Sequence, residues 1–427
     1  MSPPPSTDRL DLLPNLAAEE GDDWRGYREQ PRVRSAAHLW CLLFGRNARL
    51  RVPDSKGRWS EQPRDAFWPP ALGAPSDAPA FTWLDGRPGA TAWLNTAHLA
   101  SQARSELDVE LSGSAPQVVA SLHDKAFAVA AASDLDLAPR RLTSLVEVLS
   151  PDALRRPDEL LNRLERSLEA WPAWTERRFT LKPRFGTSGR GRVGGRDRVD
   201  VVGVRGALPR LAERGGAIFE PWLDRIGDYS VSVLVPDPGP AHALPTILGS
   251  LEIWSSASGV YRGHCGEVDS RGRVFSGDRD DESLRADAAA VVSRAREQGF
   301  AGVCGIDSFR YRERAESAQA RVERMRGAVE FNARATMGWV TIGLVRRALP
   351  IVKEPLALTP GDRRGFALTY HDPDDRDWRD RLESGLGDDA ILLDLSTGID
   401  PELPRPVLVF TRDPETLRSA RRDTFDC

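Results

Sequence analysis

The pattern of hydrophobic and polar positions is regular from about residue 119 to 350. Short apolar runs between charged turns have the length of β-strands, and they occupy 178–184, 217–223, 229–235, 246–254, 303–311 and 328–334. Residues 282–298 carry one apolar stripe that stops at Gly299, which predicts a helix. A second helix is predicted at about 338–348. Strands that alternate with helices in this way predict an α/β (α+β) fold.

The segments outside this region are harder to interpret. Residues 1–30 are rich in Pro, Asp and Glu, so we expect a flexible N-terminal arm. Residues 31–118 mix apolar runs with Pro and Gly breaks, which favours an N-terminal α/β domain. Residues 351–427 contain three strand-like runs and predict a small C-terminal α/β extension, with strands at 366–370, 391–395 and 407–410.

A lysine lies in the first turn of a predicted helix at the start of the regular region. Val118 to Leu122 reads as the end of a strand. Asp124 is then placed to cap an alanine-rich helix that carries Lys125 in its first turn.

Composition and charge exclude several classes of protein. The chain of 427 residues has a net charge of -4 and a hydrophobic fraction of 40%, so nucleic acid is not indicated as a partner. We expect a soluble, cytoplasmic protein, since no apolar run could span a membrane and the N-terminus lacks the regions of a signal peptide. The cysteines are too far apart to suggest a disulfide framework or a zinc site, at Cys41, Cys265, Cys304 and Cys427.

Lysine is rare in this chain, so the position of each lysine is informative. Of the 59 basic residues, only four are lysine: Lys56, Lys125, Lys182 and Lys353. Lysine supplies a compact charge on a flexible stem, so each retained lysine marks either a special requirement or chance.

One lysine precedes a glycine-rich loop directly. A predicted strand delivers Lys182, and a loop of small residues follows at Gly186, Thr187, Ser188, Gly189 and Gly191. Glycines allow backbone N–H groups to approach phosphate oxygens closely, and the lysine adds a full positive charge. The spacing matches neither a Walker A loop nor a dinucleotide fingerprint. A basic hairpin on the surface is the alternative.

Oxygen-bearing side chains occupy two later strands. Because side chains alternate along a strand, Glu330, Asn332 and Arg334 share one face, and Asp307 can join them if the two strands pair. Two carboxylates and an amide oxygen suit Mg²⁺. The alternative is a solvated strand face with an internal Arg–Glu pair.

A third motif lies between these two. Glu220 is followed by Trp222 and Leu223, and Asp228 comes eight residues after Glu220. An acid flanked by aromatic and apolar residues could hold a purine, and the second acid could reach ribose hydroxyls. An ordinary strand–turn–strand is the alternative.

Taken in order, these motifs resemble the ATP-grasp superfamily over residues 119–350. The resemblance implies that Lys125, in His123-Asp124-Lys125, and Lys182 contact the ATP phosphates, and that the glycine-rich loop closes over them. It also implies adenine binding at Glu220, Trp222 and Leu223, and ribose binding at Asp228, which is one residue off the usual spacing. The remaining implied roles are metal binding by Asp307, Glu330 and Asn332 and stabilisation of an acyl phosphate by Arg334.

The resemblance further implies a two-lobe enzyme with a pre-ATP-grasp N-terminal domain, an N-lobe at 119–215 and a C-lobe at 216–350. The implied activity is an ATP- and Mg²⁺-dependent ligase that joins a carboxylate to an amine, with two metal ions and Mn²⁺ as a substitute. A homodimer is common in such a family. A phosphoryl transferase on the same fold and a non-catalytic nucleotide-binding protein are the other hypotheses.

Overall fold

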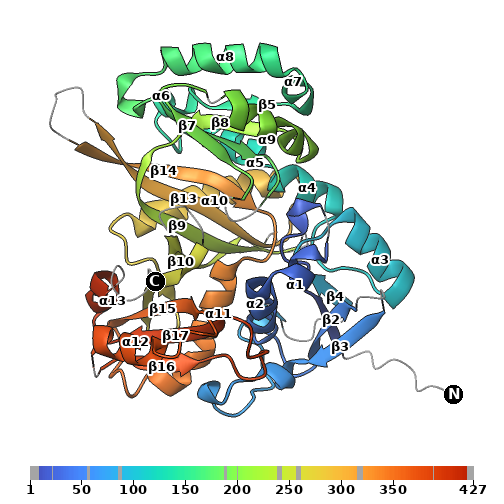
Figure 1. The fold of residues 1–427 in the computed structure, drawn as a ribbon. Helices are drawn as coiled ribbons and strands as arrows, with labels where there is room; N and C mark the ends of the chain where they lie inside the picture. The colour runs from blue at the N-terminus through green and yellow to red at the C-terminus, as the bar shows by residue number, and fades with distance from the viewer. Residues whose placement is uncertain are drawn as a thin grey trace.

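The protein is built around three β-sheets (Figure 1). The computed structural model describes residues 9–21, 23–54, 58–84, 89–186, 190–199, 201–237, 243–255, 261–314, 321–387 and 389–420. Within these ranges the strands form two four-stranded sheets and one nine-stranded sheet, each with its own helices.

The first sheet belongs to the N-terminal part of the chain and has the order β3-β2-β1-β4. Its strands are β1 (Leu10–Leu13), β2 (Ala48–Pro53), β3 (Trp59–Pro63) and β4 (Gly89–Ala92), and the nearby helices are α1 (Arg25–Glu29), α2 (Pro31–Cys41) and α3 (Ala97–Leu107). β1 pairs in parallel with both β2 and β4. The α/β prediction for this region is therefore confirmed.

The prediction of a flexible arm over 1–30 is wrong for the part that the structure describes. All four residues of β1 are buried, because the strand lies between two others in its sheet. Residues 18–20 form a 3-10 helix, and α1 follows. A segment rich in Asp and Glu is thus held in place by a short apolar strand at its start.

The second sheet forms the upper lobe in Figure 1 and has the order β5-β8-β6-β7. Its strands are β5 (Glu147–Leu149), β6 (Arg178–Pro183), β7 (Val193–Arg196) and β8 (Ala217–Pro221). The helices α7 (Pro151–Leu154), α8 (Pro157–Ala170) and α9 (Val201–Glu213) accompany this sheet. Leu164, Leu168, Val204 and Phe219 share a separate hydrophobic core here.

The large sheet has the order β14-β13-β9-β10-β12-β11-β15-β17-β16. Its strands are β9 (Asp224–Val235), β10 (Thr246–Ser255), β11 (Tyr261–Asp269), β12 (Val274–Phe275), β13 (Gly302–Arg314), β14 (Arg321–Asn332), β15 (Arg363–His371), β16 (Ile391–Asp394) and β17 (Arg405–Thr411). The three predicted C-terminal strands are confirmed. They do not form a sheet of their own, because β15 pairs with β11 and so extends the large sheet.

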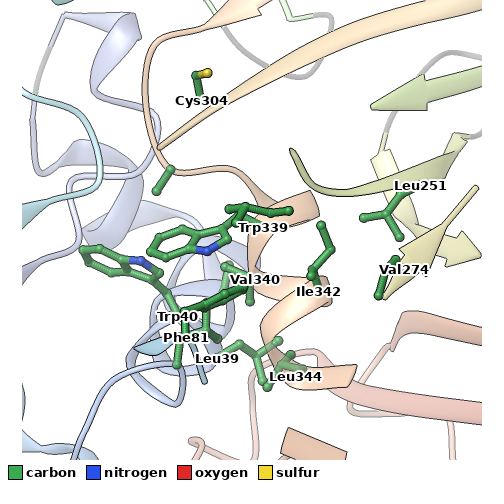
Figure 2. Close-up of a cluster of buried hydrophobic side chains, with 14 of the residues drawn as sticks. Leu39, Trp40, Phe81, Leu251, Val274, Cys304, Trp339, Val340, Ile342 and Leu344 are labelled. Carbon is green, nitrogen blue, oxygen red and sulfur yellow. The ribbon is translucent and has the colours of Figure 1, made fainter. Parts of the chain in front are cut away.

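Helix α11 (Met337–Val352) joins the N-terminal part to the large sheet. Its buried side chains pack on both sides, as Figure 2 shows for Trp339, which faces Trp40 and Phe81, and for Ile342, which faces Leu251 and Val274. The Trp83 and Trp339 rings stack with centroids 5.7 Å apart. One continuous core therefore fixes the N-terminal domain against the large sheet.

The helices that the sequence predicted are present at α10 (Asp281–Glu297) and α11. The strand end predicted at 118–122 is wrong, since these residues belong to α4 (Pro116–His123). Pro116 begins this helix, and its buried residues, Val119, Leu122 and His123, have helical spacing. The remaining helices are α5 (Lys125–Asp134), α6 (Arg140–Thr143), α12 (Trp378–Leu386) and α13 (Pro414–Ala420). Among the described residues, no helix is long and apolar enough to cross a membrane.

Candidate active site

Lys125 connects three parts of the site. It begins α5, which Asp124 caps by accepting a hydrogen bond from the Ala126 N–H, as predicted. The Lys125 side chain is buried, and Nζ donates to the Gly186 carbonyl at 2.7 Å. The same nitrogen lies 3.2 Å from Oε1 of Glu330 on β14. Lys125 therefore links the start of the glycine-rich loop to one of the predicted metal ligands.

The glycine-rich loop itself is only partly described. Gly186 has a φ of 148° and Gly191 a φ of 74°, conformations that favour glycine at both ends of the loop. Thr187, Ser188 and Gly189 lie outside the described residues.

Lys182 lies on β6 and is held by a buried carboxylate. Its Nζ is 2.8 Å from Oε1 of Glu220 on β8, and Oε2 of Glu220 accepts from Nη2 of Arg326 on β14 at 2.8 Å. Burial lowers the pKa of Lys182 to about 8, although the Glu220 charge works in the opposite direction. Burial opposes ionisation of Glu220, but Arg326 and Lys182 together lower its pKa to about 2. Glu220 is thus a fixed negative charge between two cations.

The predicted metal ligands lie together. Asp307 on β13 pairs directly with Glu330 on β14, and Nδ2 of Asn332 donates to Oδ2 of Asp307 at 3.0 Å. Burial and the nearby Glu330 charge raise the pKa of Asp307 to about 6. Two half-buried carboxylates and a buried amide form a hard-oxygen donor set that fits Mg²⁺.

This set is incomplete without other oxygen ligands. Among the residues that the structure describes, no group of three or more His, Cys, Asp or Glu side chains is arranged to hold a metal ion. Mg²⁺ usually takes one or two carboxylates and completes its shell with water and substrate phosphates. The donor set therefore fits a magnesium ion that arrives with a phosphate ligand.

Arg334 is paired with a residue from the N-terminal domain. Its guanidinium forms an ion pair with Glu19, whose side chain is fully buried and also lies 3.4 Å from Nε2 of His123. Burial opposes ionisation of Glu19, but Arg334 and His123 outweigh it and lower the pKa to about 2. Arg334 is therefore oriented by a permanent negative charge.

The segment predicted to hold adenine lies at the end of β8. The Trp222 N–H already donates to the Arg178 carbonyl at 2.8 Å. The indole ring has the Arg192 guanidinium 4.3 Å from its centroid, while the Leu223 side chain is buried. Trp222 is thus in contact with the residue that follows Gly191, at the end of the glycine-rich loop.

Asp228 is connected to this segment through Arg225. Nη1 of Arg225 donates to Oδ1 of Asp228 at 3.1 Å, and Arg225 also lies 5.0 Å from the Trp222 ring centroid. On the large sheet, Asp228 pairs with Phe309 of β13. The centroid of the Phe309 ring in turn lies 5.7 Å from the Arg326 guanidinium, which connects this group to Glu220.

The described residues Lys125, Lys182, Glu220, Asp307, Glu330 and Asn332 therefore lie together where the four-stranded sheet of β6 meets the large sheet. Burial opposes ionisation of Glu330, but the neighbouring cations outweigh it and lower the pKa. Lys125 and Lys182 are both among these cations, so both lysine charges stabilise the same carboxylate. The contact of Glu220 on β8 with Arg326 on β14 joins the two sheets, and Lys125 of α5 connects Glu330 to the Gly186 carbonyl.

Three residues of this site were not singled out from the sequence: Glu19, His123 and Arg326. A signal existed for His123, which adjoins Asp124 and Lys125. Another existed for Arg326, which precedes Glu330 by four residues on the same strand. No local pattern marks Glu19, because its partner Arg334 is more than 300 residues away.

Comparisons with known proteins identify the fold. No protein-family model matches the chain, and no curated protein matches it. The solved N5-carboxyaminoimidazole ribonucleotide synthetase of Thermus thermophilus is similar in structure, with a TM-score of 0.50 and 13% identity over 96% of each chain. The carboxyaminoimidazole ribonucleotide synthase of Aspergillus clavatus, solved with ATP, has a TM-score of 0.50 and 13% identity over 98% of each chain.

Proposed function

We propose, from the ATP-grasp fold that this chain shares with those synthetases, that it is an ATP- and Mg²⁺-dependent ligase that couples a carboxylate to an amine. One observation supports the proposal most strongly. Lys125 and Lys182 are far apart in the sequence, yet the charges of both lower the pKa of Glu330, and Lys125 forms an ion pair with it. Glu330 is in turn paired with Asp307 on the neighbouring strand. Cations beside a hard-oxygen donor set form the environment that a magnesium-bound triphosphate requires.

The residues around the lysines would position the nucleotide. Lys125 and Lys182 would hold phosphate oxygens, since each already presents its amine to an oxygen atom of the site. Glu220, Trp222 and Leu223 are our candidates for the adenine end. The bound ATP of the Aspergillus protein is consistent with ATP as the cofactor.

The proposed reaction has two steps. A substrate carboxylate attacks the γ-phosphate to give an acyl phosphate and ADP, and an amine then displaces phosphate. Asp307, Glu330 and Asn332 would hold magnesium, which neutralises phosphate charge when bound; we expect two ions, with Mn²⁺ as a substitute. Arg334 would stabilise the negative charge that develops on the carboxyl–phosphate group. Catalysis in the first step is mainly positioning and electrostatic stabilisation.

The experiment that tests the proposal is a phosphate-release screen. Purified protein is incubated with MgATP and with pairs of amino acids, amines and small carboxylates, and ADP and phosphate are measured. A ligase releases both only when a suitable carboxylate is present. Hydroxylamine then traps the acyl phosphate as a hydroxamate, whereas phosphoryl transfer to a hydroxyl gives none. ATP binding without ADP release across the panel would contradict the proposal.

A further inference from the structure

Arg326 is a buried arginine whose guanidinium is only partly hydrogen-bonded by the residues that the structure describes. The residue is 2% exposed, and its Nη2 donates to Oε2 of Glu220 at 2.8 Å. Its Nε and Nη1 atoms are buried and have no hydrogen-bond partner within the part of the chain that the structure describes. Unpaired N–H groups on a buried cation are costly, because the water that they lose on folding is not replaced. Arg326 therefore has two N–H groups left to donate to an additional acceptor.

The position of Arg326 is set by what we call the Lys182–Glu220–Arg326 triad. Glu220 holds Lys182 through Oε1 and Arg326 through Oε2, each at 2.8 Å. The two cations come from different sheets and repel each other, since the Arg326 charge adds to burial in lowering the pKa of Lys182. A carboxylate that is 1% exposed therefore fixes two cations, and the charge of one of them, Lys182, also lowers the pKa of Glu330, a proposed magnesium ligand.

We propose that Arg326 is a third cationic ligand of the bound nucleotide and donates its Nε–H and Nη1–H to phosphate oxygens. This inference rests on the proposed function and assigns a binding residue to the same site. Because Nε–H and Nη1–H point in different directions, each would donate to a different phosphate oxygen, and a hydrogen bond between two charged groups is stronger than one between neutral groups. Arg326 would also keep the Glu220 charge compensated when Lys182 turns from Glu220 to the phosphates.

Binding of MgATP and of adenosine to the full-length protein tests the assignment, with calorimetry as the readout. Arg326→Gln should weaken MgATP binding roughly 10- to 150-fold, the loss expected for a hydrogen bond to a charged group, and leave adenosine binding unchanged. Arg324→Gln is the matched control. Arg324 lies two residues away on β14, has a side chain that is 37% exposed and pairs with Glu313, so its removal should leave both affinities as they are.

The outcomes separate this inference from the proposed function. If the wild-type protein does not bind MgATP, the proposed function is wrong and the inference falls with it. If the wild-type protein binds MgATP and Arg326→Gln binds it equally well, only the inference is wrong. An equal loss for adenosine would overturn it too, because the contact would then be to the nucleoside.

A second variant covers the case in which Arg326→Gln does not fold. Arg326→Lys keeps a positive charge beside Glu220 but removes the two guanidinium N–H groups assigned to phosphate. It should bind MgATP several-fold more weakly than the wild type, with adenosine binding unchanged. Wild-type affinity for MgATP in a folded Arg326→Lys protein would overturn the assignment.

Discussion

Replacing Glu19 with glutamine should destabilise the protein by about 3–4 kcal/mol at neutral pH. The Glu19 side chain is fully buried between Arg334 and His123. Its pKa falls from the ordinary 4.5 to about 2, which corresponds to about 3–4 kcal/mol at roughly 1.4 kcal/mol per pKa unit. Breaking a buried ion pair by removing one partner costs a similar amount, about 3–5 kcal/mol.

The stability that Glu19 contributes should depend on pH. A carboxyl whose pKa is depressed by folding stabilises the native state above its unfolded pKa. That stabilisation is lost as the pH falls from about 4.5 toward about 2. The difference between wild type and Glu19→Gln should therefore be constant from about pH 7 to about pH 5 and shrink below that range.

Urea unfolding of both proteins at several pH values is the assay. The control is Glu29→Gln, because Glu29 forms an ion pair with Arg25 at 2.8 Å in which both side chains are about 60% exposed. Exposed pairs contribute at most about 1 kcal/mol. A Glu19→Gln protein as stable as the wild type, or a difference that stays constant down to about pH 2.5, would refute the reasoning.

Three further predictions concern the proposed nucleotide and metal contacts. Lys182→Ala should lower ATP turnover about 10- to 150-fold with circular dichroism unchanged, whereas Lys353→Ala, at an exposed position, should have no effect. Binding of MgATP to the wild type should weaken as the pH rises through about 8, because the Lys182 amine then loses its charge; equal affinity at about pH 7 and about pH 9.5 would count against this contact. Glu330→Gln should raise the magnesium concentration for half-maximal turnover by about tenfold or more, which a magnesium titration measures, and an unchanged requirement would argue against the metal site.

Local periodicity made most of the regular region predictable. The strands that carry Lys182, Asp307 and Glu330 follow from their own apolar and polar alternation. Pairing of these two consecutive strands could be anticipated, whereas the register that sets Asp307 opposite Glu330 is seen only in the structure. The strands depend on residues that are close in the sequence, so the local pattern of apolar and polar positions is enough to predict them.

Long-range contacts were not predictable in the same way. β1 is a strand of only four residues, and its buried position depends on partners at β2 and β4, far along the chain. The ion pair of Glu19 with Arg334 exists only once the N-terminal domain has packed on the large sheet. An acidic segment judged on composition alone therefore resembles a disordered arm.

The roles of Glu220, Trp222, Leu223 and Asp228 at the nucleoside end remain predictions. Both oxygens of Glu220 are engaged by Lys182 and Arg326, which sequence spacing does not reveal. A carboxylate has further lone pairs, so an adenine amine can still be accepted there.

The most direct test of a single triphosphate site between the two sheets is a crystal structure with magnesium and a non-hydrolysable ATP analogue. We expect triphosphate density in contact with the Lys125 and Lys182 amines, and magnesium bound by Asp307, Glu330 and Asn332. A nucleotide bound elsewhere, with Lys182 still paired to Glu220 and no metal at Glu330, would contradict it.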